Sequence, residues 1–453
     1  MFGKAKEIDM IHGPVAGKIL LFAIPLMCSS ILQLLFNAAD VVVLGRFAGD
    51  NSLAAVGSTS SLVNLIVQLF IGLSVGGNVI TARAIGEGKK DHVGAIVRTA
   101  VTTSLVSGAF LLVFGILIAK ILLKLMDVPE EVLPLSTLYM RIYFCGMPFL
   151  MLYNFGSALL RAKGDTRRPL LFLMFAGVIN VGLNCLFVIV FHMDVAGVAL
   201  ATVISQAVSG GLVLRCLCRE KDMMKLDIRH LGIDIGILKK MMRIGLPAGI
   251  QGVVFSFSNV IIQSSLNSFG AVVMAGSAAA SSVGDFIYVS MNAFHQTALS
   301  FNGQNMGAAR YDRVDKVTGL CIGYVVLFGT VLSIGAYAAG PALLGIYSTS
   351  AAVIAAGMVR MRNCTLFYEI CGIMDVMPGC IRGMGYSILP MAVSILGSCV
   401  LRLGWVATVF QVDHTVENLY LSYPVSWVIT FAVHIICYMV IRKRIRKRAA
   451  ALS

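Results

Sequence analysis

The chain has 453 residues, of which 58% are hydrophobic and only 13% are charged, and its mean hydropathy is +0.87. Because soluble globular proteins have about 25% charged residues, this composition excludes a disordered chain and argues against a soluble globular domain. The formal net charge of +14 would suit a nucleic-acid partner only if the basic residues lay together on one soluble face.

Twelve apolar runs in the chain are long enough to cross a bilayer. A hydrocarbon core of about 30 Å requires roughly 20 helical residues, and such spans should be helices because lipid cannot hydrogen-bond an exposed backbone. The expected spans are residues 17–44, 53–80, 97–123, 134–160, 169–191, 195–217, 241–268, 273–302, 317–344, 353–381, 387–410 and 418–441. The sequence therefore predicts an all-α polytopic membrane protein with twelve transmembrane helices.

The basic residues mark one side of the membrane. Of the 36 lysines and arginines, 29 lie in the N-terminal segment (which includes Lys4 and Lys6), in the even-numbered loops between spans, or in the tail at 442–453. Cytoplasmic loops carry the excess of Lys and Arg in membrane proteins. We therefore expect both termini to be cytoplasmic, the tail to act as an orientation anchor, and no nucleic acid to be bound.

The two halves of the chain repeat each other. Lys18, Pro25, Asn37 and Phe47 return 222 residues later as Lys240, Pro247, Asn259 and Phe269, and Arg161, Gly164 and Pro169 return 221 residues later as Arg382, Gly385 and Pro390. This predicts two pseudo-symmetric six-helix lobes, an N-lobe at 1–222 and a C-lobe at 223–453, with the charged linker 219–238 at their junction. Six spans are an even number, so both halves start on the same side as parallel repeats, an arrangement in which transporters carry substrate between the lobes near the midplane.

The first span contains an acid, Asp40. An ionisable residue at the membrane centre costs about 2.5–3.5 kcal/mol and is a functional candidate by default. Gln33 and Asn37 are placed at i−7 and i−3 from Asp40, so the three side chains share one helix face that should look into a cavity.

Amides and a hydroxyl at helical spacing occur in two further spans of the first half. Asn180 and Asn184 are four residues apart in span five, and Thr202 and Gln206 are four apart in span six. If these faces converge with Asp40, the site holds one carboxylate among neutral oxygens and could bind a proton or a small cation such as Na⁺. Each amide alone could equally serve as a hydrogen bond between helices.

The second half carries its own polar residues. Asn259 and Gln263 share a face of span seven, Asp285 lies in span eight, and Glu369 and Asp375 lie in span ten. Asp375 is either a cation-facing acid or the partner of a nearby base. Arg402 in span eleven requires a partner, and we expect Asp375 or Glu369 to fill that role.

Several motifs together resemble the multidrug and toxic compound extrusion (MATE) family, in its bacterial NorM/MepA-like branch. The resemblance covers essentially the whole chain. Its motifs are Phe36-Asn37-Ala38-Ala39-Asp40, Ala84-Ile85-Gly86-Glu87-Gly88, Leu160-Arg161-Ala162-Lys163-Gly164-Asp165, Val195-Ala196-Gly197-Val198-Ala199-Leu200-Ala201-Thr202, Gly303-Gln304-Asn305-Met306-Gly307-Ala308 and Ile381-Arg382-Gly383-Met384-Gly385.

The resemblance implies two V-shaped lobes and the export of small organic, often cationic, compounds against an inward H⁺ or Na⁺ gradient. It also implies a monomer in the bacterial inner membrane, in contact with lipid, with no cofactor beyond the coupling ion and no ATPase subunit. Many relatives have an Asp where this chain has Asn184, so a second carboxylate of the N-lobe is missing.

These considerations assign roles to three groups of residues. The coupling ion, H⁺ or possibly Na⁺ at Asp40, is assigned to Asp40, Asn180, Asn184 and Thr202. Substrate binding is assigned to Gln33, Phe36, Asn37, Asn154, Gln206, Asn259 and Gln263, and the secondary acids of the C-lobe are Asp285, Asp375 and Glu369.

Two other functions compete with an antiporter. A flippase for a lipid-linked precursor would need a large, strongly basic cavity, whereas Arg402 is the one arginine well inside the expected spans. A membrane-embedded enzyme would need a nucleophile–base set or a metal motif such as H-E-x-x-H, and the sequence contains neither, so we expect no enzymatic activity.

Overall fold

The computed structural model describes residues 7–451, apart from the side chains of Asp50 and Arg448. Lys4 and Lys6, and the last two residues of the predicted basic tail, therefore lie outside the described residues. Within 7–451 every regular element is a helix, and no strand occurs in this part of the chain.

The spans agree with those expected from composition. Eleven helices are long and apolar enough to cross a membrane, and a bent pair, α4 (Leu133–Cys145) and α5 (Met147–Lys163), supplies a twelfth. The pair meets at 47° around Gly146, and Pro148 in the first turn of α5 lacks the backbone N–H that would continue the helix. The prediction of an all-α protein with twelve spans is confirmed.

The chain forms two compact units, each of which is discontinuous in sequence. Unit 1 comprises residues 1–8 and 28–249, and unit 2 comprises residues 9–27 and 250–453. The boundaries fall inside α1 (Val15–Phe47) and α8 (Ile235–Asn267), two residues after Pro25 and Pro247. The first half of each of these helices thus packs in the unit that does not contain its second half. The division at 222 and 223 was drawn from the repeat and stays a prediction about the repeated halves, whereas these units are defined by contact.

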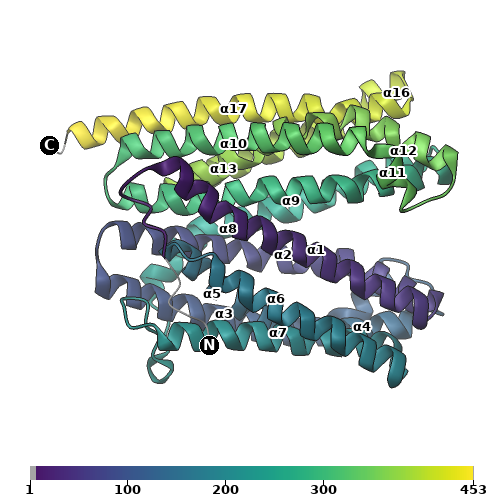
Figure 1. The fold of residues 1–453 in the computed structure, drawn as a ribbon, viewed down its shortest axis with the longest axis horizontal. Helices are drawn as coiled ribbons and strands as arrows, with labels where there is room; N and C mark the ends of the chain where they lie inside the picture. The colour runs from purple at the N-terminus through teal and green to yellow at the C-terminus, as the bar shows by residue number, and fades with distance from the viewer. Residues whose placement is uncertain (1–6, 452–453) are drawn as a thin grey trace. The chain divides into compact units, whose positions relative to one another are not determined.

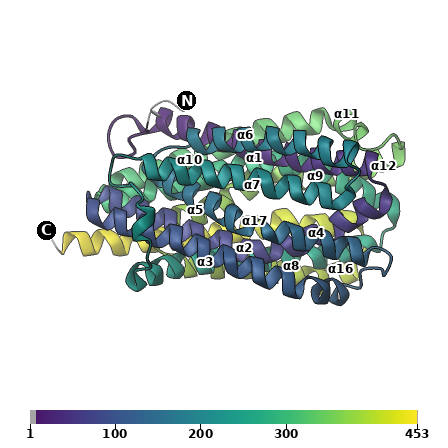
Figure 2. The ribbon, with the colours of Figure 1, turned by 90° about the horizontal axis from the view of Figure 1, so that it is seen from below.

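Unit 1 is a bundle of long helices that run side by side, as Figures 1 and 2 show. Between the halves of α1 and α8 it contains α2 (Asp50–Gly86), α3 (Lys90–Leu125), α4, α5, α6 (Arg167–Asn184), the π-helical segment η1 (Cys185–Val190), α7 (Asp194–Arg219) and the short 3₁₀ turn η2 (Ile228–His230). Its apolar core is centred on α3, α5 and α7.

Unit 2 repeats this pattern with more interruptions. Its elements after α8 are α9 (Ala271–Gly307), α10 (Tyr311–Ala338), α11 (Gly340–Gly345), α12 (Ala351–Asn363), η3 (Thr365–Phe367), α13 (Tyr368–Gly383), α14 (Ile388–Ser394), the π-helical η4 (Ile395–Val400), α15 (Leu401–Ala407), α16 (Val409–Val412) and α17 (Val416–Ala450). Helices α9, α10, α13 and α17 pack against one another and form its centre (Figure 1).

Glycines bring the first half of α8 onto α2 inside unit 1. A Cβ added at Gly245 would lie 2.6 Å from the Cα of Leu73 and 2.8 Å from the carbonyl oxygen of Gly72. Small residues spaced four apart let membrane helices approach until their backbones touch. The exchanged half of α8 is therefore held in unit 1 by direct backbone contact with α2.

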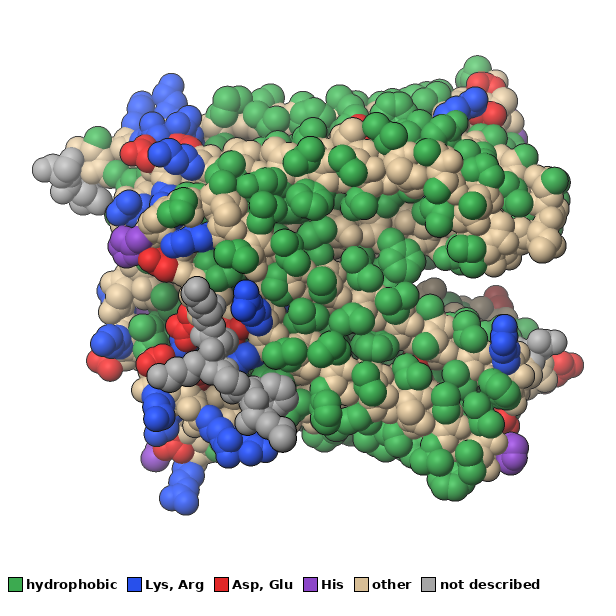
Figure 3. Space-filling view, in the orientation of Figure 1, with side chains coloured by type: hydrophobic (Ala, Val, Ile, Leu, Met, Phe, Trp, Pro, Cys, Tyr) green, Lys and Arg blue, Asp and Glu red, His purple; other side chains and the backbone are tan. Residues whose placement is uncertain are grey.

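Basic side chains of unit 2 gather at one end of its helices, where α17 ends (Figure 3). Arg310, Arg313, Lys316 and Arg446 line a cavity of about 450 Å³ at this end. Arg446 is tied to the start of α10 through ion pairs of 2.9 Å with Asp312 and 2.8 Å with Asp315. These charges stand where a positively charged helix end would contact a membrane surface.

Candidate functional site

Helix α6 places the two amides of the candidate ion site one turn apart. Asn180 and Asn184 lie at i and i+4, and both are buried, with 5% and 1% of their surface exposed. The helix changes to the π-helical segment η1 directly after Asn184. A π-helical turn releases the regular backbone pattern and is frequent at functional sites, so the local winding here sets the direction of the Asn184 side chain.

A continuous chain of hydrogen bonds joins α1, α6 and α7. The Nδ2 of Asn184 donates to the Oδ1 of Asp40 and also to the Oδ1 of Asn180, at 3.3 Å in the second case. The Nδ2 of Asn180 donates to the Oγ1 of Thr202 at 3.5 Å. Thr202 in turn donates to the carbonyl oxygen of Val198 at 3.0 Å. The structure thus brings together the four residues assigned to the coupling ion, within unit 1.

The donors in this chain leave one acceptor free. The Oδ1 of Asn184 is buried and has no hydrogen-bond partner among the described residues. An unpaired buried carbonyl oxygen costs free energy unless another group binds to it. This oxygen belongs to the same amide that binds Asp40, so it is available to a proton or a cation held at the carboxylate.

Two tyrosines of α4 complete the surroundings of Asp40. Tyr139 and Tyr143 stack with their ring centroids 6.0 Å apart, and both lie close enough to Asp40 to interact electrostatically with its carboxylate. The sequence analysis missed them. An i, i+4 pair of tyrosines inside a span was the available signal, since a phenol in lipid needs a polar neighbour.

The predicted substrate residues of unit 1 are dispersed. Gln33 and Asn37 on α1 are exposed, and Phe36 packs against Gly177 of α6. The Nδ2 of Asn154 donates to the carbonyl oxygen of Leu150 in its own helix at 2.9 Å. These positions leave their role in substrate binding a prediction.

Gln206 lies nearer the acid site than the other predicted substrate residues. Its side chain is half-buried and lies against Tyr143. It is four residues after Thr202 on the same face of α7, as the spacing predicted.

In unit 2, Asp375 is held by polar neighbours from α9. The Nδ2 of Asn292 donates to its Oδ2 at 2.8 Å, and the Nδ1 of His295 lies 2.6 Å from its backbone oxygen and 3.6 Å from its Oδ1. Arg382, one helix turn and a half further along α13, also interacts electrostatically with this carboxylate. Of the two predicted alternatives, the partner of a base describes its surroundings.

The other predicted residues of unit 2 do not converge. Asn259 and Gln263 are exposed, and Gln263 donates to the Oδ1 of Asn267 at 3.1 Å. Asp285 is exposed on α9, and the Oε2 of Glu369 is buried without a hydrogen-bond partner in the part of the chain that the structure describes.

The expected partners of Arg402 are wrong. Its Nε donates to the Oγ of Ser426 at 2.7 Å, and its guanidinium lies over the ring of Tyr423, 4.5 Å from the centroid. Sequence reasoning looked for a carboxylate because charge is most simply paired with charge. The side chain instead packs on the aromatic face of α17, which a period in the sequence could not reveal.

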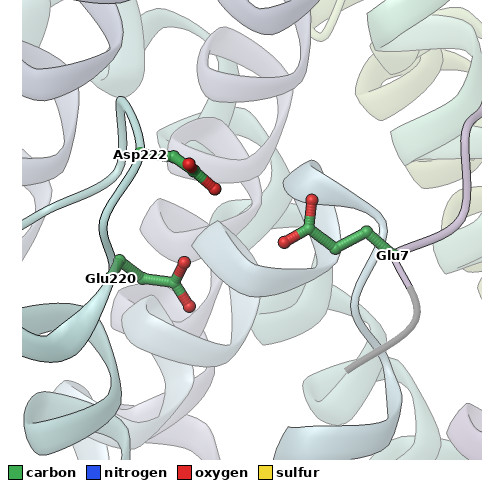
Figure 4. A group of neighbouring side chains, drawn as sticks. All are labelled: Glu7, Glu220 and Asp222. Carbon is green, nitrogen blue, oxygen red and sulfur yellow. The ribbon is translucent and has the colours of Figure 1, made fainter. Parts of the chain in front are cut away.

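A separate ionic network ties the N-terminal segment to the end of unit 1 (Figure 4). Glu7, Glu220 and Asp222 point toward one another, and the ammonium of Lys163 lies among them, at 2.7, 2.7 and 3.0 Å from their oxygens. Three carboxylates at this spacing could hold a metal ion, but Lys163 already occupies the position between them.

Glu220 is the most enclosed acid of this network. Burial alone would raise the pKa of its carboxyl, but the hydrogen bonds from Lys163 and Arg168 outweigh burial, and the pKa is lowered. The ionised form is therefore stabilised in the folded protein.

The fold and its repeated halves define a class of protein. A multi-pass membrane protein built from two parallel six-helix repeats, with a buried acid in one repeat, has the architecture of a secondary transporter. The sequence profile of the MatE family matches residues 25–186 and again residues 247–406, once in each repeat. The chain therefore belongs to the MatE family.

Curated relatives and solved structures agree with this assignment. The chain is 28% identical over 406 residues to the probable multidrug resistance protein YpnP of Bacillus subtilis, covering 89% of this chain and 90% of the relative. It is 25% identical over 353 residues to the FAD transporter of Shewanella oneidensis, covering 76% and 77%. A crystal structure of MATE in complex with MaL6 has a TM-score of 0.92 at 20% identity, covering 98% of this chain and 100% of that one.

Membership of this family settles the general class of activity. The protein is a transporter of the MATE multidrug efflux family and not an enzyme. It is a multi-pass membrane protein, and its bacterial relatives indicate the inner membrane.

Proposed function

We propose that this protein exports small organic compounds in exchange for an inward-moving cation, H⁺ or Na⁺, and that Asp40 is the residue at which the cation binds. The observation that carries the proposal is the hydrogen-bond chain from Thr202 through the two asparagines to Asp40. A half-buried carboxylate ringed by neutral oxygens inside a span has no structural necessity, since an amide would hydrogen-bond the neighbouring helix at lower cost.

The amide of Asn184 can serve both charge states of Asp40. When the carboxylate is ionised, the Nδ2 of Asn184 donates to it. When a proton binds, the new O–H needs an acceptor, and rotation of the amide by half a turn presents the Oδ1 of Asn184, which otherwise has no partner among the described residues. The same oxygen would be a ligand for Na⁺. Loading with a cation thus changes the hydrogen bonds of α6 next to its π-helical segment.

For loading to drive transport, the cation must bind two states of the carrier with different free energies. The junction of α6 with η1 is where such a difference would arise, because a π-helical turn has an alternative hydrogen-bond register available. Alternating access is then a change in the relation of the two repeats, with the loaded and unloaded acid favouring different ends of it.

The proposed substrates are amphipathic organic compounds, including the cations to which an unprotonated Asp40 would be attractive. The relatives do not narrow this class, because their names include both multidrug resistance proteins and an FAD transporter. We further propose a monomer with both termini cytoplasmic, since basic side chains gather where α17 ends. A flippase would call for a strongly basic central cavity, which the acid–amide site of unit 1 does not offer.

The experiment is efflux from everted membrane vesicles in a host that lacks its own pumps. Ethidium transport is measured with a pH gradient alone, with a Na⁺ gradient alone, and with neither. Asp40→Asn should abolish the dependence on the effective gradient, because the amide keeps the size of the side chain but cannot bind a cation as a carboxylate does.

The matched control is Asp91→Asn, which removes an exposed acid at the start of α3, and it should transport as the parent does. Full gradient-dependent efflux by the Asp40→Asn variant would exclude Asp40 as the coupling residue.

A further inference from the structure

Unit 2 contains two arginines inside its membrane spans that have no carboxylate as a close partner. Arg402 on α15 is 4% exposed, and Arg360 on α12 is half-buried. Neither forms an ion pair within 4 Å with any acid among residues 7–451. A guanidinium in a bilayer is costly unless something compensates its charge, so these two positions require an explanation.

The groups around the arginines are hydroxyls and aromatic rings. Arg360 donates from Nη1 to Ser277 Oγ at 2.6 Å and from Nη2 to Ser281 Oγ at 3.3 Å. Both guanidiniums lie over one ring, that of Tyr423, at 6.0 Å for Arg360 and 4.5 Å for Arg402. Hydroxyl and aromatic partners orient a cation, but they carry no negative charge to neutralise it.

One acid lies near enough to matter. Asp285 on α9 interacts electrostatically with Arg360 without forming an ion pair. A single carboxylate beside two guanidiniums leaves the region with a net positive charge. Asp375 does not change this balance, since it is held by Asn292 and His295.

The repeat shows that this region is the counterpart of the Asp40 site. Arg360 and Tyr423 stand 221 residues after Tyr139 and Thr202, and Arg402 falls within one residue of the position that matches Asn180. The same backbone positions therefore carry neutral groups around an acid in unit 1 and guanidiniums on an aromatic face in unit 2.

We infer that unit 2 contains a binding site for the anionic group of an aromatic organic compound, a carboxylate or a phosphate, formed by Arg360, Arg402 and the ring of Tyr423. Each guanidinium has five N–H donors, of which the bonds above use two in Arg360 and one in Arg402. The remaining donors form the planar fork that binds carboxylate and phosphate oxygens in pairs. Arg360 and Tyr423 are half-buried and Asp285 is exposed, so the site is reached from the Arg360 side.

The aromatic part of the ligand has a place as well. Trp427 lies 5.8 Å from the guanidinium of Arg402, and Trp405 packs in the same apolar cluster. A flat ring would stack on this surface while its charged group binds the arginines. The inference adds a substrate class to the proposed function, and it rests on that function only in taking the ligand to be cargo.

The chain supplies its own reporter for this site, because Trp405 and Trp427 are its only tryptophans. We would titrate the full-length protein in nanodiscs with 4-nitrobenzoate, a flat anion that quenches indole fluorescence, and with 4-nitrobenzylammonium, which has the same ring and the opposite charge. The anion should quench saturably, and the cation should quench only by collision. Equal saturable quenching by both compounds, or no saturable quenching by the anion, would overturn the inference.

Substitutions then locate the binding. Arg360→Gln and Arg402→Gln should each raise the dissociation constant for 4-nitrobenzoate at least about tenfold, as expected for the loss of a charge-assisted hydrogen-bond pair. Arg402→Lys keeps the charge but not the fork and should fall between the parent and the glutamine variant. The control is Arg362→Gln, an exposed arginine two residues along α12, which should bind as the parent does.

Unchanged affinity in both glutamine variants would refute the site. Should Arg402→Gln fail to fold, Arg360→Gln and Arg402→Lys still decide the matter. Asp40→Asn separates this inference from the proposed coupling, because it should retain saturable quenching by 4-nitrobenzoate even where gradient-driven transport is lost.

Discussion

The contact between α2 and the first half of α8 should be intolerant of a single methyl group. An alanine at Gly72 would place its Cβ 2.8 Å from the carbonyl oxygen of Gly245 and closer still to the backbone of Gly249. Because carbon atoms at optimal contact are about 3.5–4.0 Å apart, the two helices would have to separate by roughly 1 Å. Overpacking of this kind costs about 1–3 kcal/mol.

Gly57 offers a matched control on the same helix. A Cβ at Gly57 meets nothing within 4 Å, so Gly57→Ala should stabilise α2 by about 0.5–1 kcal/mol through the lower backbone entropy of alanine in the unfolded chain. The same chemical change is thus expected to have opposite signs at two places in one helix. Melting temperatures of the purified variants in detergent measure this, with Gly72→Ala lower than the parent by about 1–4 °C.

The consequence should extend to transport, because α8 continues into unit 2 beyond Gly249. Gly72→Ala should slow gradient-driven efflux, whereas Gly57→Ala should not. If the two alanine variants melted at the same temperature, α2 and α8 would not be in backbone contact and the exchange of helix halves between the units would be wrong.

Three further perturbations test separate parts of the protein. Asn184→Asp would put a second carboxylate beside Asp40, and since two adjacent charges need a counter-cation, Na⁺ should stimulate efflux several-fold more than in the parent; an unchanged ratio of Na⁺-driven to H⁺-driven efflux would argue against a shared ion site. Glu220→Gln should cost about 1–2 kcal/mol of stability near pH 7; because the pKa of Glu220 is lowered on folding, its contribution is present above the ordinary value of 4.5 and is lost as the pH falls through the lowered pKa, so the difference in melting temperature from the parent should shrink toward about pH 3. Gly164→Ala should strain a backbone with φ of 106° and press on Ile8, and limited proteolysis should then cut the N-terminal segment faster than in the parent.

Much of the fold follows from quantities that a sequence carries openly. Span length depends on bilayer thickness, and the repeat is visible as identities at fixed offsets, so twelve helices in two similar halves could be predicted. The exchange of the first halves of α1 and α8 could not. A helix keeps one apolar pattern whichever neighbour it packs on, and Pro25 and Pro247 show where a helix can bend but not where it goes.

The candidate site was predicted to the extent that helical spacing fixes direction. Asn180, Asn184 and Thr202 meet Asp40 because polar residues four apart must share a face, and lipid excludes such a face from the outside. Tyr139 and Tyr143 escaped notice because they lie on α4, whose orientation depends on the bend at Gly146. No local rule converts a 47° bend into a list of neighbours.

The opposite charges of the two repeats bear on how cargo and ion can be coupled. In unit 1 the cation competes for a carboxylate, whereas the proposed anion in unit 2 binds guanidiniums, so the two ligands share no atom for which to compete. Any coupling must then act through a conformational equilibrium, and thermodynamic linkage makes it reciprocal: the factor by which a proton at Asp40 changes the affinity for 4-nitrobenzoate equals the factor by which 4-nitrobenzoate changes the affinity for the proton. Quenching titrations of Trp405 and Trp427 across pH should show a change of roughly 5–150-fold in the parent, the usual range of such coupling, and none in the Asp40→Asn variant. An identical pH dependence in parent and variant would mean that Asp40 and the arginines of unit 2 are energetically independent, and the exporter would then have to couple its ion and its cargo at a single site.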